Sequence, residues 1–385
     1  MKLTPYKLGD LCRMKYGKMP PKDVLSDEGF PVFSGYRITG YAKEYLWDDS
    51  RVIVVARGVG GTGDVKISPE KAWITNLSIV LDHDRKVIDK RFLFYRLGLE
   101  PLKAKLNTGA AQAQITIDSL KSYVLPLPNL KTQKQIVYIL STYDDLIENN
   151  RRRIQLLEQA ARLLYREWFV HLRFPGHEHV KITDGVPEGW EKGCVGSLAN
   201  VKSGYAFKSK DWQQEGNPVI KIKNIVGDGT IDISNCDCVS DNVAEIASNF
   251  KILIGALLIA MTGATVGKVG IMPNSSKQYF LNQRVGMFKS KNHNSVEGYL
   301  FPFFQGGFAQ NQVQNLAGGA AQPNISGGQI ESIELLIPEK KIYDLYLDST
   351  KDIFQQRQNL HEQNESLSQA RDLLLPRLMN GKVPV

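Results

Sequence analysis

Cysteine is scarce in this chain of 385 residues. The four cysteines, Cys12, Cys194, Cys236 and Cys238, form no C-x-x-C pair, and the nearest two are separated by one residue. That spacing is wrong for a structural zinc site. We therefore expect free thiols in a reducing compartment, and no metal bound by this chain.

Long hydrophobic runs and catalytic signatures are missing as well. No run of about 18 apolar residues is present to span a bilayer, and the first residues, MKLTPYKLGD, lack the apolar stretch of a signal peptide. The sequence has no H-E-x-x-H, no G-x-S-x-G and no Asn/Asp-Pro-Pro-Tyr/Phe segment. His177-Glu178-His179 could suggest a metal, but it has no third ligand in view. We expect a soluble cytoplasmic protein with no catalytic residues.

A glycine-rich segment at residues 52–65, VIVVARGVGGTGDV, carries Gly58, Gly60 and Gly63 at the G-x-G-x-x-G spacing of a dinucleotide site. That site needs a helix after the last glycine, whereas DVKISPEKAWI alternates like a strand and contains Pro69. The pattern favours a loop between strands, where glycines permit positive φ and close approach of backbone N–H groups to a phosphate. A plain tight turn is the alternative.

The chain repeats itself. GDL at 9–11 returns as GSL at 196–198, and EGFPVFSG at 28–35 returns as EGNPVIKI at 215–222, both at an offset of 187 residues. Three further matches pair the glycine loop from Arg57 with MTGATVGKVGI from Met261 (offset 204), Asn76 with Asn282 (206), and GAAQ at 109–112 with GAAQ at 319–322 (210). An offset that only grows indicates two copies of one fold, the second with longer loops.

Each copy begins with short strand-like segments, among them RVIVVA and NLSIVLDH in the first and GALLIAM in the second. A more helical stretch follows, at 91–106 and at 296–316. Gly, Pro and Asn separate these segments, which is typical of strands joined by turns. We expect two similar mixed α/β heads.

A long helix is predicted after the first head, over 131–172, because this range contains no glycine or proline. Thr132 with Gln135 has the spacing of a capping box at its start. At 1.5 Å per residue it would be about 60 Å long, more than one domain usually covers, so we expect a paired helix rather than a core helix. Its heptad seam consists of Ile136, Leu140, Tyr143, Ile147, Asn150, Ile154, Leu157, Ala161, Leu164 and Trp168.

The partner helix is predicted at 340–380. Asn150 facing its polar positions could fix the register at a cost in stability. Pro376 should kink or end this helix, and Asn380-Gly381 should cap it. Its apolar seam positions are Tyr346, Ile353, Leu360, Leu367 and Leu374, and the positions between them, Ser349, Gln356, Gln363, Ala370 and Arg377, are small or polar.

The sequence thus predicts an α+β protein in which two heads are separated by two long antiparallel helices with a pseudo-two-fold repeat. The heads would lie at opposite ends, facing in opposite senses. Such a pair suits two separated, inverted sites on one duplex, because half-site spacing mirrors the symmetry of the protein. The predicted ranges are 1–130 for head 1, 131–172 for its helix, 173–190 for a linker, 191–338 for head 2 and 339–385 for the last helix.

Several polar residues are candidates for DNA contact. The net charge of +8 is consistent with a polyanionic partner. Amide side chains can read adenine and Arg can read guanine. Lys202, Lys208, Lys210, Lys221 and Lys223 form a basic cluster, offset in the sequence only by Asp211 and Glu215. The candidates are Ser34, Tyr36, Arg37, Arg57, Gly60, Thr62, Asn76, Gln112, Gln114, Lys221, Lys223, Asn224, Thr262, Thr265, Lys268, Asn282, Gln283, Arg284, Gln322 and Asn324.

The layout resembles the DNA specificity (S) subunit of type I restriction-modification enzymes. The resemblance covers essentially the whole chain. It is carried by the glycine loops, both GAAQ segments, and LPLPNLKTQKQIVYIL (125–140), YREWFVHLRFPGHE (165–178), VPEGWE (186–191) and ARDLLLPRLMNGKV (370–383). The second helix departs from the pattern, because it reads EKKIYDL where the first reads QKQIV.

The resemblance implies two target-recognition domains, each reading one half of a bipartite double-stranded DNA sequence, with the helices setting the spacer. It also implies two methyltransferase (M) subunits, which bring S-adenosylmethionine, and two restriction (R) subunits, which use ATP and Mg. The chain itself would bind no cofactor. The departure at EKKIYDL leaves equal docking of the two M subunits open. Two alternatives remain at this stage: a protein-interaction scaffold with duplicated domains, and a nucleotide-dependent enzyme.

Overall fold

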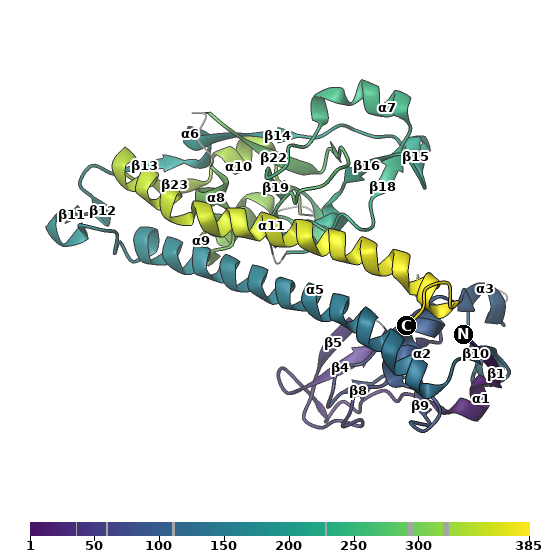
Figure 1. The fold of residues 1–385 in the computed structure, drawn as a ribbon. Helices are drawn as coiled ribbons and strands as arrows, with labels where there is room; N and C mark the ends of the chain where they lie inside the picture. The colour runs from purple at the N-terminus through teal and green to yellow at the C-terminus, as the bar shows by residue number, and fades with distance from the viewer. Residues whose placement is uncertain (36, 59–60, 110–111, 228, 292–295, 319–322) are drawn as a thin grey trace. The chain divides into compact units, whose positions relative to one another are not determined.

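The structure, a computed structural model, describes residues 1–385 except 36, 59–60, 110–111, 228, 292–295 and 319–322. The chain divides into two compact units (Figure 1). Unit 1 comprises Met1–Leu146 and Leu367–Val385, and unit 2 comprises Ile147–Ser366. Each unit combines one head with part of both long helices.

The described residues of head 1 form three small sheets. The first is antiparallel, in the order β2-β9-β6-β7, and the second has the order β3-β5-β4-β8, with β4 and β8 parallel. A third pairs β1 with β10. The strands are β1 (Thr4–Lys7), β2 (Cys12–Tyr16), β3 (Leu25–Ser26), β4 (Phe30–Ser34), β5 (Arg37–Ala42), β6 (Val52–Val55), β7 (Val65–Ile67), β8 (Trp73–Ile74), β9 (Ser78–His83) and β10 (Val124–Leu127).

Helices cover the first sheet of head 1. Asp89 caps α2, because its side chain accepts hydrogen bonds from the backbone N–H groups of Arg91 and Phe92. Buried residues of β6, α2 and β10 form the core together with Ile136 and Leu140 of the long helix. The short helices are α1 (Leu8–Leu11), α2 (Lys90–Gly98), α3 (Leu102–Leu106) and α4 (Ile117–Lys121).

Head 2 repeats this topology strand for strand. Its sheets have the orders β14-β22-β19-β20-β17, β15-β18-β16-β21 and β13-β23, so among the described residues β17 is the only strand added. The repeat inferred from the sequence is confirmed. The strands are β13 (Glu191–Cys194), β14 (Ala199–Ser203), β15 (Trp212–Gln213), β16 (Asn217–Ile220), β17 (Gly229–Thr230), β18 (Asp237–Val239), β19 (Leu257–Ala260), β20 (Val269–Ile271), β21 (Phe280–Leu281), β22 (Val285–Ser290) and β23 (Glu334–Ile337).

The remaining elements of unit 2 are helices and one hairpin. The predicted helical stretches at 91–106 and 296–316 are both confirmed, each divided into two helices. In unit 2 the elements are α6 (Val195–Leu198), α7 (Asp241–Ile246), α8 (Glu297–Phe304), α9 (Gly307–Ala317), α10 (Gly327–Glu331), β11 (Ile182–Thr183) with β12 (Val186–Pro187), and the turns η1 (Arg166–Val170), η2 (His177–His179), η3 (Ser209–Asp211), η4 (Ile222–Asn224), η5 (Ser248–Phe250) and η6 (Gly263–Thr265).

Backbone pairing corrects the sequence match of the glycine loops by one residue. Arg57 forms an isolated β-bridge with Gln114, and Thr262 forms the same bridge with Asn324. The equivalent of Arg57 is therefore Thr262, not Met261. From the bridge residue to the last glycine, the first loop contains one residue more than the second. An alignment without a gap that matches the last glycines therefore pairs Arg57 with the residue before its true equivalent.

A second match is wrong by one residue for a similar reason. The backbone N–H of Thr75 donates to the carbonyl of Phe33, and that of Asn282 donates to the carbonyl of Ile220. Asn282 therefore occupies the place of Thr75 rather than that of Asn76. The identity of two asparagines suggested the wrong register.

The long helix α5 runs over Leu130–Tyr165 and continues into the π-helical turn η1. Its cap is Asn129, whose Oδ1 accepts a hydrogen bond of 2.9 Å from the N–H of Thr132. The predicted Thr132–Gln135 cap is therefore wrong. Gln133 is buried and donates to the carbonyls of Val87 and Pro128, which fastens this end of α5 to head 1.

The second long helix, α11, runs over Lys340–Met379 and passes through Pro376 instead of ending there. Leu378 and Met379 are buried in the core of head 1, and their burial favours the extra turn after the proline. Gly381 follows with φ +66°, the left-handed conformation expected at a helix C-terminus.

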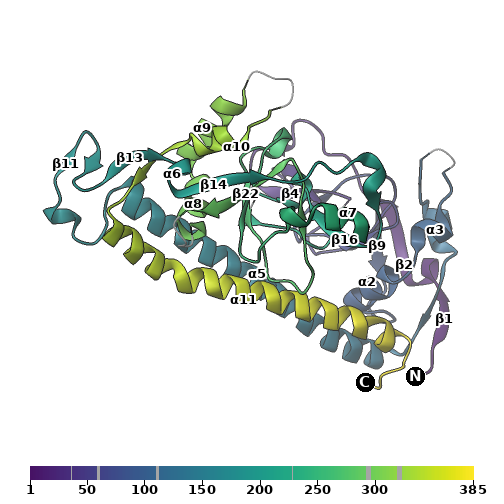
Figure 2. The ribbon, with the colours of Figure 1, turned by 90° about the horizontal axis from the view of Figure 1, so that it is seen from above.

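The two long helices pair antiparallel within each unit (Figures 1 and 2). In unit 1, Arg371 on α11 contacts Asp144 on α5. In unit 2, Asn150 Nδ2 donates to Gln363 Oε1 at 3.4 Å, and the rings of Tyr165 and Tyr346 lie 6.2 Å apart between centroids. Numbers that rise along α5 therefore meet numbers that fall along α11, which confirms the predicted pairing and the polar contact of Asn150.

The predicted seam of α5 holds at Ile154, Ala161 and Trp168, which are buried, but the two predicted positions between them are each displaced by one residue. Leu157 and Leu164 are partly exposed, and Glu158 and Tyr165 are buried in their place. The buried positions 150, 154 and 158 are spaced by four residues twice in succession, a stutter in the heptad pattern.

The seam of α11 shifts as well. Ser349 and Gln356 were predicted between the apolar positions, but both are exposed, and Thr350 and Arg357 are buried instead. Of the other predicted seam residues, Leu140, Ile147, Ile154, Tyr346 and Leu360 are buried, and Tyr143, Ile353, Leu367 and Leu374 are half-buried.

Candidate DNA interface

Three segments that were singled out separately meet at the end of β6 in unit 1. The N–H of Ala56 donates to the carbonyl of Leu77 at 2.8 Å, and the N–H of Ile115 donates to the carbonyl of Ala56 at 2.8 Å. The bridge between Arg57 and Gln114 extends this junction. The glycine loop, the segment around Asn76 and the segment after the first GAAQ thus form one surface.

A fourth segment joins them through a pair of hydroxyl groups. Thr75 Oγ1 donates to Ser34 Oγ at 3.2 Å, which links the end of β8 to the end of β4. Arg37, which follows Ser34 by three residues and begins β5, is exposed.

The same junction occurs at the end of β19 in unit 2. The N–H of Met261 donates to the carbonyl of Arg284 at 2.9 Å, and the N–H of Ile325 donates to the carbonyl of Met261 at 2.9 Å. The hydrogen bond from Asn282 to Ile220 brings in the segment that begins at Lys221. Four sequence segments therefore converge alike in both units.

The last glycine of each loop is required by the fold. Gly63 has φ +93°, and a Cβ at this position would lie 2.7 Å from the backbone nitrogen of Lys103. Gly267 has φ +81°, and a Cβ there would lie 2.7 Å from Val313 Cγ1. Strands β7 and β20 follow the loops, so the predicted strand in place of a dinucleotide-binding helix is confirmed. The sequence suggested that the loop glycines let the backbone approach a phosphate closely. At Gly63 the backbone instead lies close to α3 of the same head.

Two candidate side chains are buried and form hydrogen bonds inside the heads. Thr62 is 4% exposed and donates to the carbonyls of Gly58 and Ala113. Asn224 is 2% exposed and donates to the carbonyl of Asp232 at 2.8 Å. Since these groups are buried and hydrogen bonded, the structure argues against a direct base contact by either side chain.

Other candidates have side chains that DNA can reach. Arg57 and Gln112 in unit 1 and Gln283, Arg284 and Asn324 in unit 2 are exposed. Asn76, Gln114, Thr262, Thr265 and Lys268 are half-buried, and Asn282 is 7% exposed with its Oδ1 accepting a hydrogen bond from the N–H of Arg284. Three further candidates, Tyr36, Gly60 and Gln322, lie outside the described residues.

The lysine cluster of head 2 is offset by a carboxylate that its sequence neighbourhood does not contain. Asp237, on β18, contacts the Nζ of Lys221 at 2.7 Å and that of Lys223 at 3.0 Å. Lys221 Nζ also lies 3.2 Å from the centroid of the Trp212 ring. Burial would raise the pKa of Asp237, but hydrogen bonds from the two lysines lower it overall. Asp237 therefore offsets one positive charge of the cluster, at Lys221 and Lys223.

Burial or a backbone contact characterises two of the thiols and one of the histidines. Burial raises the pKa of Cys12 to about 12 and that of Cys236 to about 11, so both are neutral thiols. His177 Nδ1 lies 2.8 Å from the carbonyl of Phe174. Within the described ranges no group of three His, Cys, Asp or Glu is placed to hold a metal, and no helix there is long and apolar enough to cross a membrane.

Two copies of one head, each presenting the same polar junction and followed by a long helix, define a class of two-headed nucleic-acid readers. The sequence matches the family model described as "Type I restriction modification DNA specificity domain" over residues 2–159 and again over 187–364. The chain belongs to this family.

Individual relatives match over most of the chain. It is 24% identical to the type I restriction enzyme MjaVIII specificity subunit of Methanocaldococcus jannaschii, over 98% of this chain and 92% of that protein. It is also 24% identical to the HindI specificity subunit of Haemophilus influenzae, over 70% of this chain and 71% of that protein. The crystal structure of a type I restriction-modification S subunit from M. genitalium covers 98% of this chain and 96% of that one, with a TM-score of 0.57 and 19% identity, and has the same fold.

Proposed function

We propose that this chain is the DNA-reading subunit of a type I restriction-modification enzyme, with each head reading one half of a bipartite target. The observation that carries the proposal is the polar junction, which is assembled from the same four segments in both units. Exposed Arg and amide side chains at the junction have the chemistry that reads guanine and adenine.

We further propose that catalysis resides in the partners. Two methyltransferase subunits would bring S-adenosylmethionine, and two restriction subunits would bring ATP and Mg, whereas this chain would bind none of them and act in the cytoplasm. Its own part would be to select the site and to hold the partners on it.

An exposed apolar surface in unit 2 supports a docking role. A cavity of about 1220 Å³ opens between the end of α5, β13 and α9. It is bordered by Leu163, Val170 and Phe308, whose exposed fractions are 43%, 62% and 64%. Apolar side chains this exposed and this close together are typical of a surface that a partner covers.

Co-expression with a methyltransferase subunit, followed by mapping of methylated adenines, tests the proposal. We expect a split motif with an unspecified spacer. A continuous motif would contradict the two-head reading. A salt titration of DNA binding separates it from the scaffold alternative, because neutralised phosphates make affinity fall steeply with salt. Equilibrium dialysis with NAD or ATP tests the enzyme alternative, for which micromolar binding to the isolated chain would be expected.

A further inference from the structure

The helix pair of unit 2 contains a buried ion pair. Arg357 Nε on α11 contacts Glu158 Oε1 on α5 at 2.6 Å, and the two side chains are 1% and 4% exposed. Arg357 Nη2 also donates to the carbonyl of Gly229 at 2.8 Å, which ties the pair to β17 of head 2. The guanidinium carbon lies 5.8 Å from the centroid of the Phe301 ring.

Stability alone is a poor explanation for this pair. Removing two charges from water is costly, and well-packed apolar residues of similar size often stabilise a protein as well or better. Arg357 Nη1 is buried with no hydrogen-bond partner among the described residues, so the pair is not fully satisfied. Buried polar contacts between helices are best known for fixing register.

The sequence provides for this pair only once, although the helices are repeats of each other. Strands β10 and β23 and the helices after them are related by an offset of 210 residues. At that offset Glu158 corresponds to Ser368, and Arg357 corresponds to Ile147. Neither equivalent is charged, so the ion pair breaks the symmetry of two otherwise similar heptad stripes.

A change of register would separate the charges. Moving α11 by one heptad would place Thr350 or Asn364 where Arg357 lies, and neither can neutralise a buried carboxylate. Such a slip displaces one helix by about 10 Å, at 1.5 Å per residue, which corresponds to roughly three base pairs of DNA. The penalty of an unpaired buried charge therefore opposes a change of register.

We propose that Glu158 and Arg357 fix the register of α5 against α11 and thereby the number of base pairs between the two half-sites. The inference rests on the proposed function and deepens it by naming positioning residues for spacer selection. Neither residue needs to touch DNA.

The test uses the complex reconstituted with its methyltransferase subunit. Duplexes carrying the two half-sites with spacers changed by one to three base pairs are compared with the natural spacer. The double variant Glu158→Leu/Arg357→Met removes both charges and leaves an apolar seam, so we expect it to fold. Its preference for the natural spacer should fall by about tenfold, the change that roughly 1.4 kcal/mol of lost preference produces.

Asp144→Leu/Arg371→Met is the matched control, because it removes the more exposed helix–helix pair of unit 1. We expect it to keep the natural spacer preference. If the Glu158/Arg357 double variant fails to fold, Glu158→Gln/Arg357→Gln, which removes both charges without leaving either one unpaired, should show the same loosening. An unchanged preference in the folded variant overturns the inference. A wild-type complex that recognises no split target overturns the proposed function instead.

Discussion

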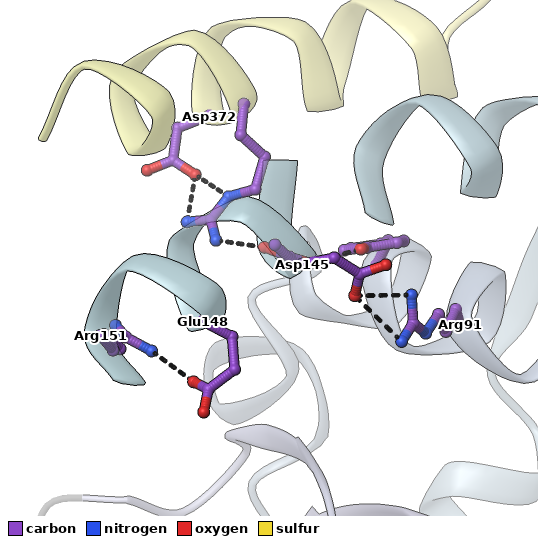
Figure 3. A network of polar contacts seen from close by, with 8 residues as sticks. Arg91, Asp145, Glu148, Arg151 and Asp372 are labelled. Carbon is purple, nitrogen blue, oxygen red and sulfur yellow. Dashed lines mark hydrogen bonds and ion pairs between the residues drawn. The ribbon is translucent and has the colours of Figure 1, made fainter. Parts of the chain in front are cut away.

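The two units hold the same pair of helices together in different ways. In unit 1 the helices meet through Arg371 and Asp144, whose side chains are 28% and 31% exposed, and Arg371 also contacts Asp372 on its own helix. Figure 3 shows Asp372 at this contact, and below it Arg91 of α2 reaching Asp145 of α5. In unit 2 the ion pair between Arg357 and Glu158 is almost completely buried.

The comparison separates what the repeat conserves from what it varies. Apart from β17, the strand order is the same in both heads, and so are the backbone junctions and the positive φ of the last loop glycine, Gly63 or Gly267, because they follow from backbone geometry. The polar contacts of the helices are made by side chains and differ. Solvent weakens the unit 1 pair, whereas the unit 2 pair is costly to break.

The largest expected effect comes from the apolar seam that both units share. Ile147→Asp buries a carboxylate without a partner at a position that is 4% exposed, and should cost about 3–5 kcal/mol of unfolding free energy. Leu157→Asp is the matched control, since Leu157 lies outside the shifted seam and is partly exposed. Urea unfolding of both variants measures the difference. Equal losses would contradict the shift of the seam.

The glycine loop should be the next most sensitive place. Gly63→Ala places a Cβ against the backbone of Lys103 at a positive φ, and should destabilise unit 1 by about 1–3 kcal/mol. Gly40→Ala is the control, because nothing lies within 4 Å of its Cβ position and its φ is not positive. Thermal unfolding distinguishes them. A neutral Gly63→Ala would show that the loop has room to relax.

A substitution at the polar junction of one head should change recognition of one half-site and leave the other half-site unchanged. Arg57→Ala should weaken DNA binding by about 1–3 kcal/mol if it contacts a base, and relax only the half-site read by head 1. Arg284→Ala should do the same for the other half-site. Mapping methylation motifs of the two variants gives each an internal control in the untouched half. Relaxation of both halves by one substitution would argue against one head per half-site.

The exposed helix contact of unit 1 should matter less. Arg371→Met removes a pair that is about 30% exposed, so the expected loss is below about 1 kcal/mol. The loss should shrink further at high salt, because screening weakens exposed ion pairs. Denaturation at two ionic strengths measures it. A salt-independent loss would indicate that packing of the Arg371 stem matters more than its charge.

The smallest effect is expected at Asp237, and it depends on pH. Because the pKa of Asp237 is lowered in the folded state, its ion pairs stabilise unit 2 above the unfolded pKa of about 3.9, and this contribution disappears as pH falls through the folded pKa. Its side chain is 38% exposed, so the contribution should stay below about 1 kcal/mol. Asp237→Asn should therefore be less stable than wild type at pH 7 and equal to it in strong acid. A difference that persists in acid would contradict this origin.

Much of the architecture could be predicted from the sequence, because repeats and heptads are periodic along the chain. The two heads, the helix partners and the contact of Asn150 are examples. The burial of Glu158 in place of Leu157 could not be predicted, since a pattern of apolar residues places charged residues outside. Glu158 is buried where it meets Arg357, which lies 199 residues further along the chain.

The candidate interface was predictable as a set of segments but not as individual side chains. Loop residues such as Arg57 and Arg284 were found because they follow strands. Asn224 and Thr62 are also polar candidates, yet their side chains face inward to the carbonyls of Asp232 and Gly58. Asp237 meets Lys221 and Lys223 because strands β16 and β18 are neighbours in the sheet. A count of charges close to the lysines in the sequence does not include Asp237.

The return of α11 to head 1 has a consequence for how the protein is made. Leu378 and Met379 complete a hydrophobic core whose other members include Leu8 and Val52. The ribosome synthesises the two parts of that core at different times, because all of unit 2 is translated between them. Head 1 is thus synthesised first but can complete its core only last. A nascent chain that stops before Leu378 would expose the apolar residues that Leu378 and Met379 cover, and such a surface is a binding site for chaperones.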